Sequence, residues 1–401
     1  MKTGIIVVNT GSPAAPAPDA VEAYLRAYLM DDRIRQLPRP LWRNLMHKHV
    51  LPKRKFTSAE RYRSVWTPQG SPLEVNQQRL VDKVQAAYDR EEGTPQEATL
   101  DSAYDRMPGD AGSQSQNDGK PASCYDARTG TDGRAGDAVS TDAHRAVVVR
   151  SAMSYGSFSI EDALKDVRSA GCERIVLLPL YPQSAHSTTQ AVIDAFFRAR
   201  KRIGWNPPSC LIDNYHDNPL YIQTIADRVL ASGFQPGGDA RLMFSFHAIP
   251  LKDEKAGDTY RGQAERTAEL VANALGMPAS RITLAYQSVF GPKESAWVSP
   301  LAAHVLESWR DADFPVFFCC PGFAVDCLET LYDIPNIMVP ALEGDASRPR
   351  ACAADTGGDI QAACNTTGRF TWVPCLNASD AAARLVKDVL DVNMAASAFG
   401  D

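Results

Sequence analysis

The run Leu242-Met243-Phe244-Ser245-Phe246 is short, almost wholly apolar and followed at once by His247. Its length and its aromatic and aliphatic side chains predict a β-strand buried on both faces, as in a parallel sheet. Similar runs recur along the chain, with stretches of helical spacing between them. This alternation predicts an α/β protein whose parallel sheets are covered by helices. The predicted strands are 4–8, 146–153, 174–180, 209–212, 242–246, 282–286, 315–319 and 370–373, and the predicted helices include 159–170, 188–202, 219–231, 258–275, 300–309, 324–333 and 379–389.

Length and composition narrow the class of protein. A chain of 401 residues, 44% of them hydrophobic, predicts a soluble protein of two domains. A net charge of -6 argues against a nucleic-acid partner, which would need clustered Lys and Arg. Neither a signal peptide nor a membrane-spanning stretch is recognisable. Nine cysteines without a secretory segment favour reduced thiols, so we expect a cytoplasmic protein, with contact at the membrane surface left open.

Two segments interrupt the alternation of strands and helices. Residues 91–144 are rich in Gly, Ser, Asp, Gln and Thr and carry almost no aliphatic periodicity. Residues 341–369 are similar but shorter. Such compositions cannot bury enough apolar surface to join a core, so both segments are interpreted as insertions.

His247 is the first candidate site residue. It follows the carboxyl end of an apolar strand, which is where open α/β sheets bind their ligands. The alternative is a hydrogen-bonded His with a structural role only.

The segment from Cys319 to Leu331 supplies the second candidate site. A predicted strand, a Pro-Gly turn and the predicted helix 324–333 would place Asp326, Glu329 and Asp333 on one helical face. Three acids on one face usually mark a solvated surface, but the position directly after a strand favours a cleft. The cysteines at 319, 320 and 327 lack zinc-site spacing and are interpreted as buried thiols.

Two polar segments complete the candidates. The hydroxyl-rich run 184–189 follows a Pro-rich strand end and could cap a helix or bind carboxylates, and His186 within it is interpreted as an exposed loop residue. A basic group is interpreted as a surface patch that could meet propionates or anionic lipid. That group comprises His47, Lys48, His49, Lys53, Arg54 and Lys55.

Taken together, these motifs resemble the ferrochelatase family over nearly the whole chain outside the two insertions. Phe244–Pro250 is similar to the family's "SFHG-P" motif, and Cys320–Leu331 is similar to its "CPGF-aDCLETL" motif. Further motifs agree in the same order along the chain. They are Asn9–Pro13, Gly70–Leu73, Ala152–Gly156, Leu178–Gln183, Gly257–Gln263 and Gln287–Pro292 with Trp297.

The resemblance implies two Rossmann-like domains, each a parallel sheet flanked by helices, with a porphyrin cleft between them. The first would span 1–183 and take back a carboxyl-terminal helix at 385–401, and the second would span 184–384. His247 and Glu329 would be the catalytic pair and the metal site, facing each other across the porphyrin, and Asp333 would guide iron. Porphyrin contacts would come from Ser71, Tyr155, Tyr181, Phe246 and Trp297.

The implied function is insertion of ferrous iron into protoporphyrin IX, which forms protohaem and releases two protons. Coproporphyrin III as the substrate and a non-catalytic tetrapyrrole carrier are the alternatives. Iron is a substrate, and no cofactor is required. An iron–sulfur cluster to which Cys352, Cys364 and Cys375 contribute is the less favoured alternative, because such a cluster needs four ligands. The chain departs from the family motifs at three positions. Thr10 is not expected to be an axial metal ligand, and Ser154 and Val289 stand where family members carry an arginine. Pro335 is expected to end the acidic helix.

Overall fold

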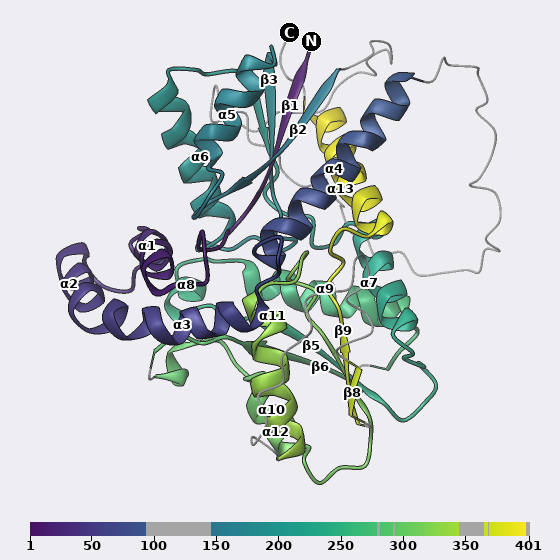
Figure 1. The fold of residues 1–401 in the computed structure, drawn as a ribbon. Coiled ribbons are helices and arrows are strands. Elements are labelled where there is room, and N and C mark those ends of the chain that lie inside the picture. Colours follow the sequence, from purple (N-terminus) through teal and green to yellow (C-terminus); the bar gives the residue numbers. More distant parts are fainter. Residues whose placement is uncertain (94–145, 279–280, 292, 345–364, 368, 398–401) are drawn as a thin grey trace, which may run out of the picture.

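The structure is a computed structural model that describes residues 1–93, 146–278, 281–291, 293–344, 365–367 and 369–397. Two sheets form the upper and lower parts of the molecule in Figure 1. The α/β architecture predicted from the sequence is confirmed, and each predicted strand is present with ends that differ by at most one residue. The connecting helices lie on both faces of each sheet.

The first sheet has four parallel strands in the order β2-β1-β3-β4. Alternate side chains of β1 point to opposite faces, and Ile5, Ile6, Val7 and Val8 are all fully buried. Ile6 and Val8 pack against α5 (Ile160–Ser169) and α6 (Thr189–Ile203), whereas Ile5 and Val7 face α4 (Pro72–Gly93) and α13 (Asp380–Ala396). The strands are β1 (Thr3–Asn9), β2 (Val147–Met153), β3 (Arg174–Pro179) and β4 (Ser209–Leu211).

The second sheet has the order β6-β5-β7-β9-β8, with the first four strands parallel and β8 antiparallel at the edge. Here α7 (Pro219–Ala231) and α9 (Tyr260–Ala274) pack with Phe244, while α10 (Ala302–Ser308) and α12 (Val339–Glu343) pack with Met243. The strands are β5 (Arg241–His247), β6 (Ile282–Gln287), β7 (Val316–Cys319), β8 (Asn365–Thr367) and β9 (Phe370–Val373), and the short helix α8 (Leu251–Lys255) follows β5.

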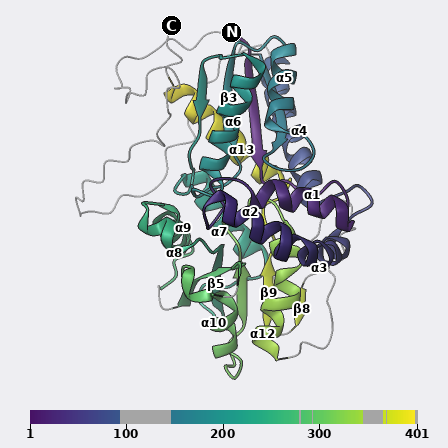
Figure 2. The ribbon, with the colours of Figure 1, turned by 90° about the vertical axis from the view of Figure 1, so that its left-hand side faces the viewer.

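A group of amino-terminal helices projects sideways between the two sheets, as both views show (Figures 1 and 2). It consists of α1 (Pro18–Leu29), α2 (Arg39–Leu45), the π-helical turn η1 (Met46–Val50) and α3 (Leu51–Val65). Its members share a small core around Trp42, Met46 and Leu51. This group forms one side of the pocket described below.

The predicted domain limits need correction. The boundary after residue 183 separates β3 from β4, but these strands pair in one sheet, so the chain leaves the first sheet only after Leu211. The last helix starts at Asp380, within one residue of the predicted start, so the domain limit at 385 cuts through it. It bonds to both parts of the molecule: Tyr88 of α4 donates to Asp391, and Asn218 at the start of α7 donates to Asp388.

The predicted insertions fall largely outside the described residues. Residues 91–93 end α4, and residues 94–144 lie outside the description. In the second insertion, 341–343 end α12 and 365–367 form β8, while 345–364 and 368 lie outside it.

The predicted acidic helix 324–333 is wrong at both ends. Helix α11 (Leu328–Leu331) starts four residues late, and Asp326 lies before it, fully buried. Pro335 does not stop the chain's helical path, which continues through the π-helical turn η4 (Ile334–Met338) into α12. In a regular α-helix the proline ring would meet the carbonyl four residues earlier, and a widened turn accommodates it.

Candidate active site

A large pocket lies between the carboxyl ends of the two sheets. It encloses about 1330 Å³ of empty space, including its open mouth. Ligand sites of α/β proteins lie at this place, beyond the carboxyl ends of the parallel strands. Its lining comes from the ends of β1, β3, β5 and β7 and from α1, α3, α4 and α11. Residues that line the pocket include Thr10, Ser12, Tyr24, Tyr28, Arg54, Tyr62, Ser71, Tyr181, His247, Gly322, Cys327 and Glu329.

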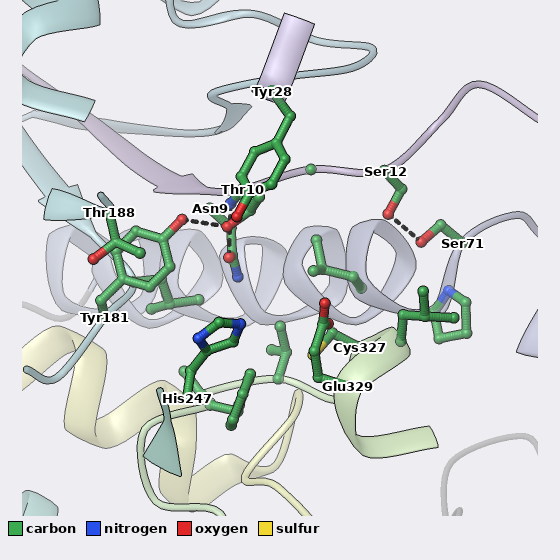
Figure 3. A pocket seen from close by; sticks show the side chains of 18 of the residues that line it. Asn9, Thr10, Ser12, Tyr28, Ser71, Tyr181, Thr188, His247, Cys327 and Glu329 are labelled. Atoms are coloured by element: carbon green, nitrogen blue, oxygen red, sulfur yellow. Dashed lines mark hydrogen bonds between the residues drawn. The ribbon is translucent and has the colours of Figure 1, made fainter. Parts of the chain in front are cut away.

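His247 and Glu329 lie on the same wall of this pocket. His247 ends β5 and Glu329 belongs to α11, which follows β7, so both come from the second sheet. Figure 3 shows the two side chains on its lower side, with Thr10 and Tyr28 above them. The resemblance implied that His247 and Glu329 face each other across the ligand. Both instead line one wall, because β5 and β7, which precede them, are parallel neighbours whose carboxyl ends lie at one edge of the second sheet.

The ring of His247 is held by one hydrogen bond. Nδ1 lies 2.7 Å from the carbonyl oxygen of Ala248. A carbonyl can only accept, so Nδ1 carries the proton and Nε2 keeps its lone pair when the ring is neutral. His247 therefore presents a nitrogen that can accept a proton or bind a metal ion.

Glu329 is positioned through its backbone by Gln287 at the end of β6. The buried Gln287 side chain donates from Nε2 to the Glu329 carbonyl at 2.9 Å, and its Oε1 accepts from the Ser245 hydroxyl at 2.6 Å. Cys327 lies beside Glu329, and burial, followed by this carboxylate, raises the pKa of its thiol well above the ordinary value. The sheet thus fixes where α11 begins.

Asp333 lies one helical turn beyond Glu329, next to the pocket lining rather than in it. Its Oδ2 accepts a hydrogen bond of 3.0 Å from Ser288, which has a left-handed backbone (φ 64°). Its Oδ1 is 3.8 Å from Nη1 of Arg61 on α3. Burial, reinforced by the charge of Glu329, raises the pKa of Asp333 to about 6. The two carboxylates therefore share one electrostatic environment.

The opposite wall is built where the loops after β1 and β2 meet. Gly11 (φ 96°) and Gly156 (φ 106°) allow this approach, since a Cβ at either glycine would lie within 1.8 or 2.3 Å of a carbonyl oxygen of the other loop. On this wall the Thr10 hydroxyl lies 2.7 Å from the Tyr181 hydroxyl, and Tyr28 reaches the pocket from α1 (Figure 3).

A third part of the lining is polar. The hydroxyls of Ser12 and Ser71 lie 2.6 Å apart. Arg54 on α3 also lines the pocket, with its guanidinium 4.6 Å from the ring centre of Phe290. Burial lowers the pKa of Arg54, because the charged form is partly removed from water. Among the pocket-lining residues that the structure describes, Arg54 is the only Lys or Arg.

Several predicted site residues lie elsewhere. Phe246 is fully buried in the core beneath Gly322, because the residue before His247 points to the opposite face of β5. Trp297 bonds to the Phe290 carbonyl outside the lining, and Tyr155 packs edge-on behind Tyr28 at 5.3 Å. Ser71, Tyr181, His247 and Glu329 do line the pocket.

Helices α1 and α3 contribute lining residues that were not predicted from the sequence. Tyr24, Tyr28 and Tyr62 line the pocket, and Arg54, which was assigned to a surface patch, does too. The helical spacing of Ser58, Tyr62 and Val65 was the available signal, since all three line the pocket. Spacing identifies a shared face, but not what that face covers.

The cysteines behave as buried thiols where the structure describes them. Cys319, Cys320 and Cys327 are all at most 7% exposed, as predicted, and Cys375 is also buried. Cys352 and Cys364 lie outside the described residues. His186 is partly exposed, and its backbone N–H donates to Asp258. Within the described ranges, no cluster of three or more His, Cys, Asp or Glu could hold a metal ion, and no helix is long and apolar enough to cross a membrane.

The fold and the pocket define an α/β protein of two parallel sheets with a large binding site between their carboxyl ends, in which an imidazole and a carboxylate share one wall. The sequence model of the family described as Ferrochelatase matches residues 2–106 and 134–343, so the chain belongs to the ferrochelatase family.

Individual relatives agree with this assignment. Ferrochelatase of Nitrosococcus oceani is 31% identical over 97% of this chain and 86% of its own length. Ferrochelatase of Aeromonas hydrophila is 33% identical over 97% of this chain and 98% of its own length. Among solved structures, SirB from Bacillus subtilis with Fe3+ aligns with a TM-score of 0.47 at 9% identity, covering 98% of this chain and 96% of that one.

Proposed function

We propose that this protein is a ferrochelatase that inserts ferrous iron into a porphyrin, with His247 and Glu329 as its catalytic residues. The observation that carries the proposal is that both side chains line one wall of the pocket between the carboxyl ends of the two sheets. Membership of the family supports the same reaction.

The chemistry requires two pyrrole N–H protons to leave the porphyrin as the metal enters. The unprotonated Nε2 of His247 is a suitable proton acceptor, because Nδ1 already donates to the Ala248 carbonyl and the Nε2 lone pair is left free. The carboxylate of Glu329 can attract the divalent ion and share the protons. Because both groups lie on one wall, we propose that they act on the same face of the macrocycle.

The opposite wall would press on the other face of the porphyrin. It presents Thr10, Tyr181 and Tyr28, whose hydroxyls and rings offer contact but no strong metal ligand. Bending the macrocycle against this wall would expose the nitrogen lone pairs, so binding energy would be used to approach the transition state.

We propose protoporphyrin IX as the substrate, giving protohaem, with coproporphyrin III as the alternative. Protoporphyrin carries two carboxylates and coproporphyrin four. The described lining offers a single guanidinium, Arg54, with the hydroxyls of Ser12 and Ser71 as further donors. Buried carboxylates need charged or hydrogen-bonding partners, so this lining suits the smaller number.

An anaerobic assay with ferrous iron and each porphyrin tests the proposal, following the loss of porphyrin fluorescence and the rise of haem absorbance. We expect turnover of protoporphyrin that is lost in His247→Ala and Glu329→Gln. A higher kcat/KM for coproporphyrin than for protoporphyrin would identify coproporphyrin III as the substrate instead. If the wild-type protein bound porphyrin without turnover, this would support a non-catalytic tetrapyrrole carrier and contradict the proposed enzymatic function.

We also propose a cytoplasmic enzyme that touches an anionic membrane through α2 and α3. Residues 33–59 contain eight Lys and Arg and no Asp or Glu. Leu41 (62% exposed) and Phe56 (55% exposed) project from this basic segment. Exposed apolar side chains among cations bind anionic lipid surfaces. Co-sedimentation with phosphatidylglycerol vesicles should fall in Leu41→Ser/Phe56→Ser, and equal binding to neutral vesicles would contradict the electrostatic part.

A further inference from the structure

Helix α3 carries a second arginine, Arg61, whose side chain lies next to Asp333, just outside the pocket lining. Arg61 lies 3.8 Å from Asp333, measured from Nη1 to Oδ1. Its guanidinium carbon is also 5.0 Å from the centre of the Tyr332 ring. Contacts with two consecutive residues hold the arginine over this turn of the chain.

The position of Arg61 differs from that of Arg54 on the same helix. Arg54 lines the pocket, whereas Arg61 is outside the lining, with a side chain that is 44% exposed and lies next to Asp333. Asp333 itself is only 10% exposed and has Ser288 on its other oxygen. From outside the pocket lining to inside it, the order is therefore Arg61, Asp333 and then Glu329.

Such an order matters for a divalent cation. Two neighbouring carboxylates attract it, but a guanidinium at the outer one cancels part of their field and occupies an oxygen that the ion could use. The arginine cannot lose its charge near neutral pH, so it has to move aside. A side chain that is nearly half exposed can do so at low cost, since exposed ion pairs are weak.

We propose that Arg61 is a specificity-determining residue that covers the outer carboxylate, Asp333, and sets the affinity of the enzyme for ferrous iron. The inference rests on the proposed function, because it takes iron to pass Asp333 on its way to Glu329. Removing the charge of Arg61 should favour the cation, while the groups that act on the porphyrin stay in place.

The test compares Arg61→Gln with the wild-type enzyme in steady-state kinetics with ferrous iron as the varied substrate. We expect the KM for iron to fall threefold to fivefold, the range open to a partly exposed ion pair, with kcat within about twofold. Arg61→Lys should keep most of the wild-type KM. Arg63→Gln is the matched control, because Arg63 is exposed on the same helix, and its KM should not change.

A double mutant separates a charge effect from a structural one. In an Asp333→Asn background, Arg61→Gln should no longer lower the KM for iron, because the carboxylate it covers is gone. An unchanged or higher KM in Arg61→Gln, a loss of kcat at constant KM, or the same decrease in the Asp333→Asn background would each overturn the inference.

Metal binding without porphyrin distinguishes this inference from the proposed function. Calorimetric titration of the porphyrin-free protein with Zn2+ should show tighter binding in Arg61→Gln than in the wild-type protein. If Arg61→Gln bound Zn2+ more tightly than the wild-type protein but neither protein metallated a porphyrin, only the proposed function would fail. If it metallated porphyrin but Arg61→Gln left both metal affinity and KM unchanged, only the role of Arg61 would fail.

Discussion

Asp333→Asn should make the protein more stable at neutral pH, although it replaces a residue near the catalytic wall. Burial and the charge of Glu329 raise the pKa of Asp333 from 3.8 to about 6 in the folded protein. At 1.36 kcal/mol per pKa unit, the charged form is disfavoured in the folded state by about 3 kcal/mol. Asparagine has nearly the same shape and carries no charge, so it avoids most of this cost.

The stability gain should depend on pH in a defined direction. Between pH 3.8 and 6 the folded protein binds the Asp333 proton more strongly than the unfolded chain does, so the wild-type protein loses stability as pH rises through this window. The difference between Asp333→Asn and wild type should therefore grow from about 1 kcal/mol at pH 4.5 to about 3 kcal/mol at pH 7.5. Urea unfolding at the two pH values measures it.

Asp326→Asn is a matched control that should change the free energy of unfolding in the opposite direction, making the protein less stable. Asp326 is fully buried and accepts hydrogen bonds from the Thr330 hydroxyl at 2.9 Å and from the Asn377 amide at 2.6 Å. An amide in its place would direct a donor at these donors, which should cost about 1–3 kcal/mol at pH 7.5. A wild-type protein more stable than Asp333→Asn at pH 7.5, or a difference that does not grow with pH, would refute the reasoning.

Three further outcomes are expected. Gln287→Leu removes the donor to the Glu329 carbonyl and should lower kcat for metal insertion at least tenfold while porphyrin affinity, measured by fluorescence, changes little; an unchanged kcat would contradict its positioning role. Gly156→Ala should lower the thermal midpoint or prevent folding, because its Cβ would lie 2.3 Å from the Ser12 carbonyl oxygen, and a wild-type midpoint would count against that packing. Replacing residues 94–144 by a short Gly-Ser linker should leave metal insertion largely intact, and a folded but inactive protein would refute this.

The strands were predictable because each has a local cause. An apolar run of five to eight residues must be buried on both faces of a sheet, and this needs no knowledge of its neighbours. The same locality explains why Ser159 caps α5 in the structure: its side chain accepts from the Asp162 backbone, and the Asp162 side chain accepts from the Ser159 backbone. His247 and Glu329 were found from the position of each after a strand and from the motifs around them.

The errors arose where distant segments decide the outcome. Asp326 fits the helical spacing of its segment. In the structure its backbone N–H and its carboxylate instead bond to the side chain of Asn377, which follows β9 in the chain, and α11 starts only after it. The assignment of β4 to the first sheet depends on its pairing with β3, which apolar composition does not reveal.

The pocket shows the same division between local and long-range information. Composition and periodicity determined the α/β class, the strands and the strand-end histidine, since these follow from burial and backbone geometry over a few residues. Whether Arg54 and Tyr62 line the pocket, and which wall carries Glu329, was decided by how α3 and α11 pack across more than 250 residues of sequence. Such packing depends on the shapes of surfaces that meet only in the folded chain.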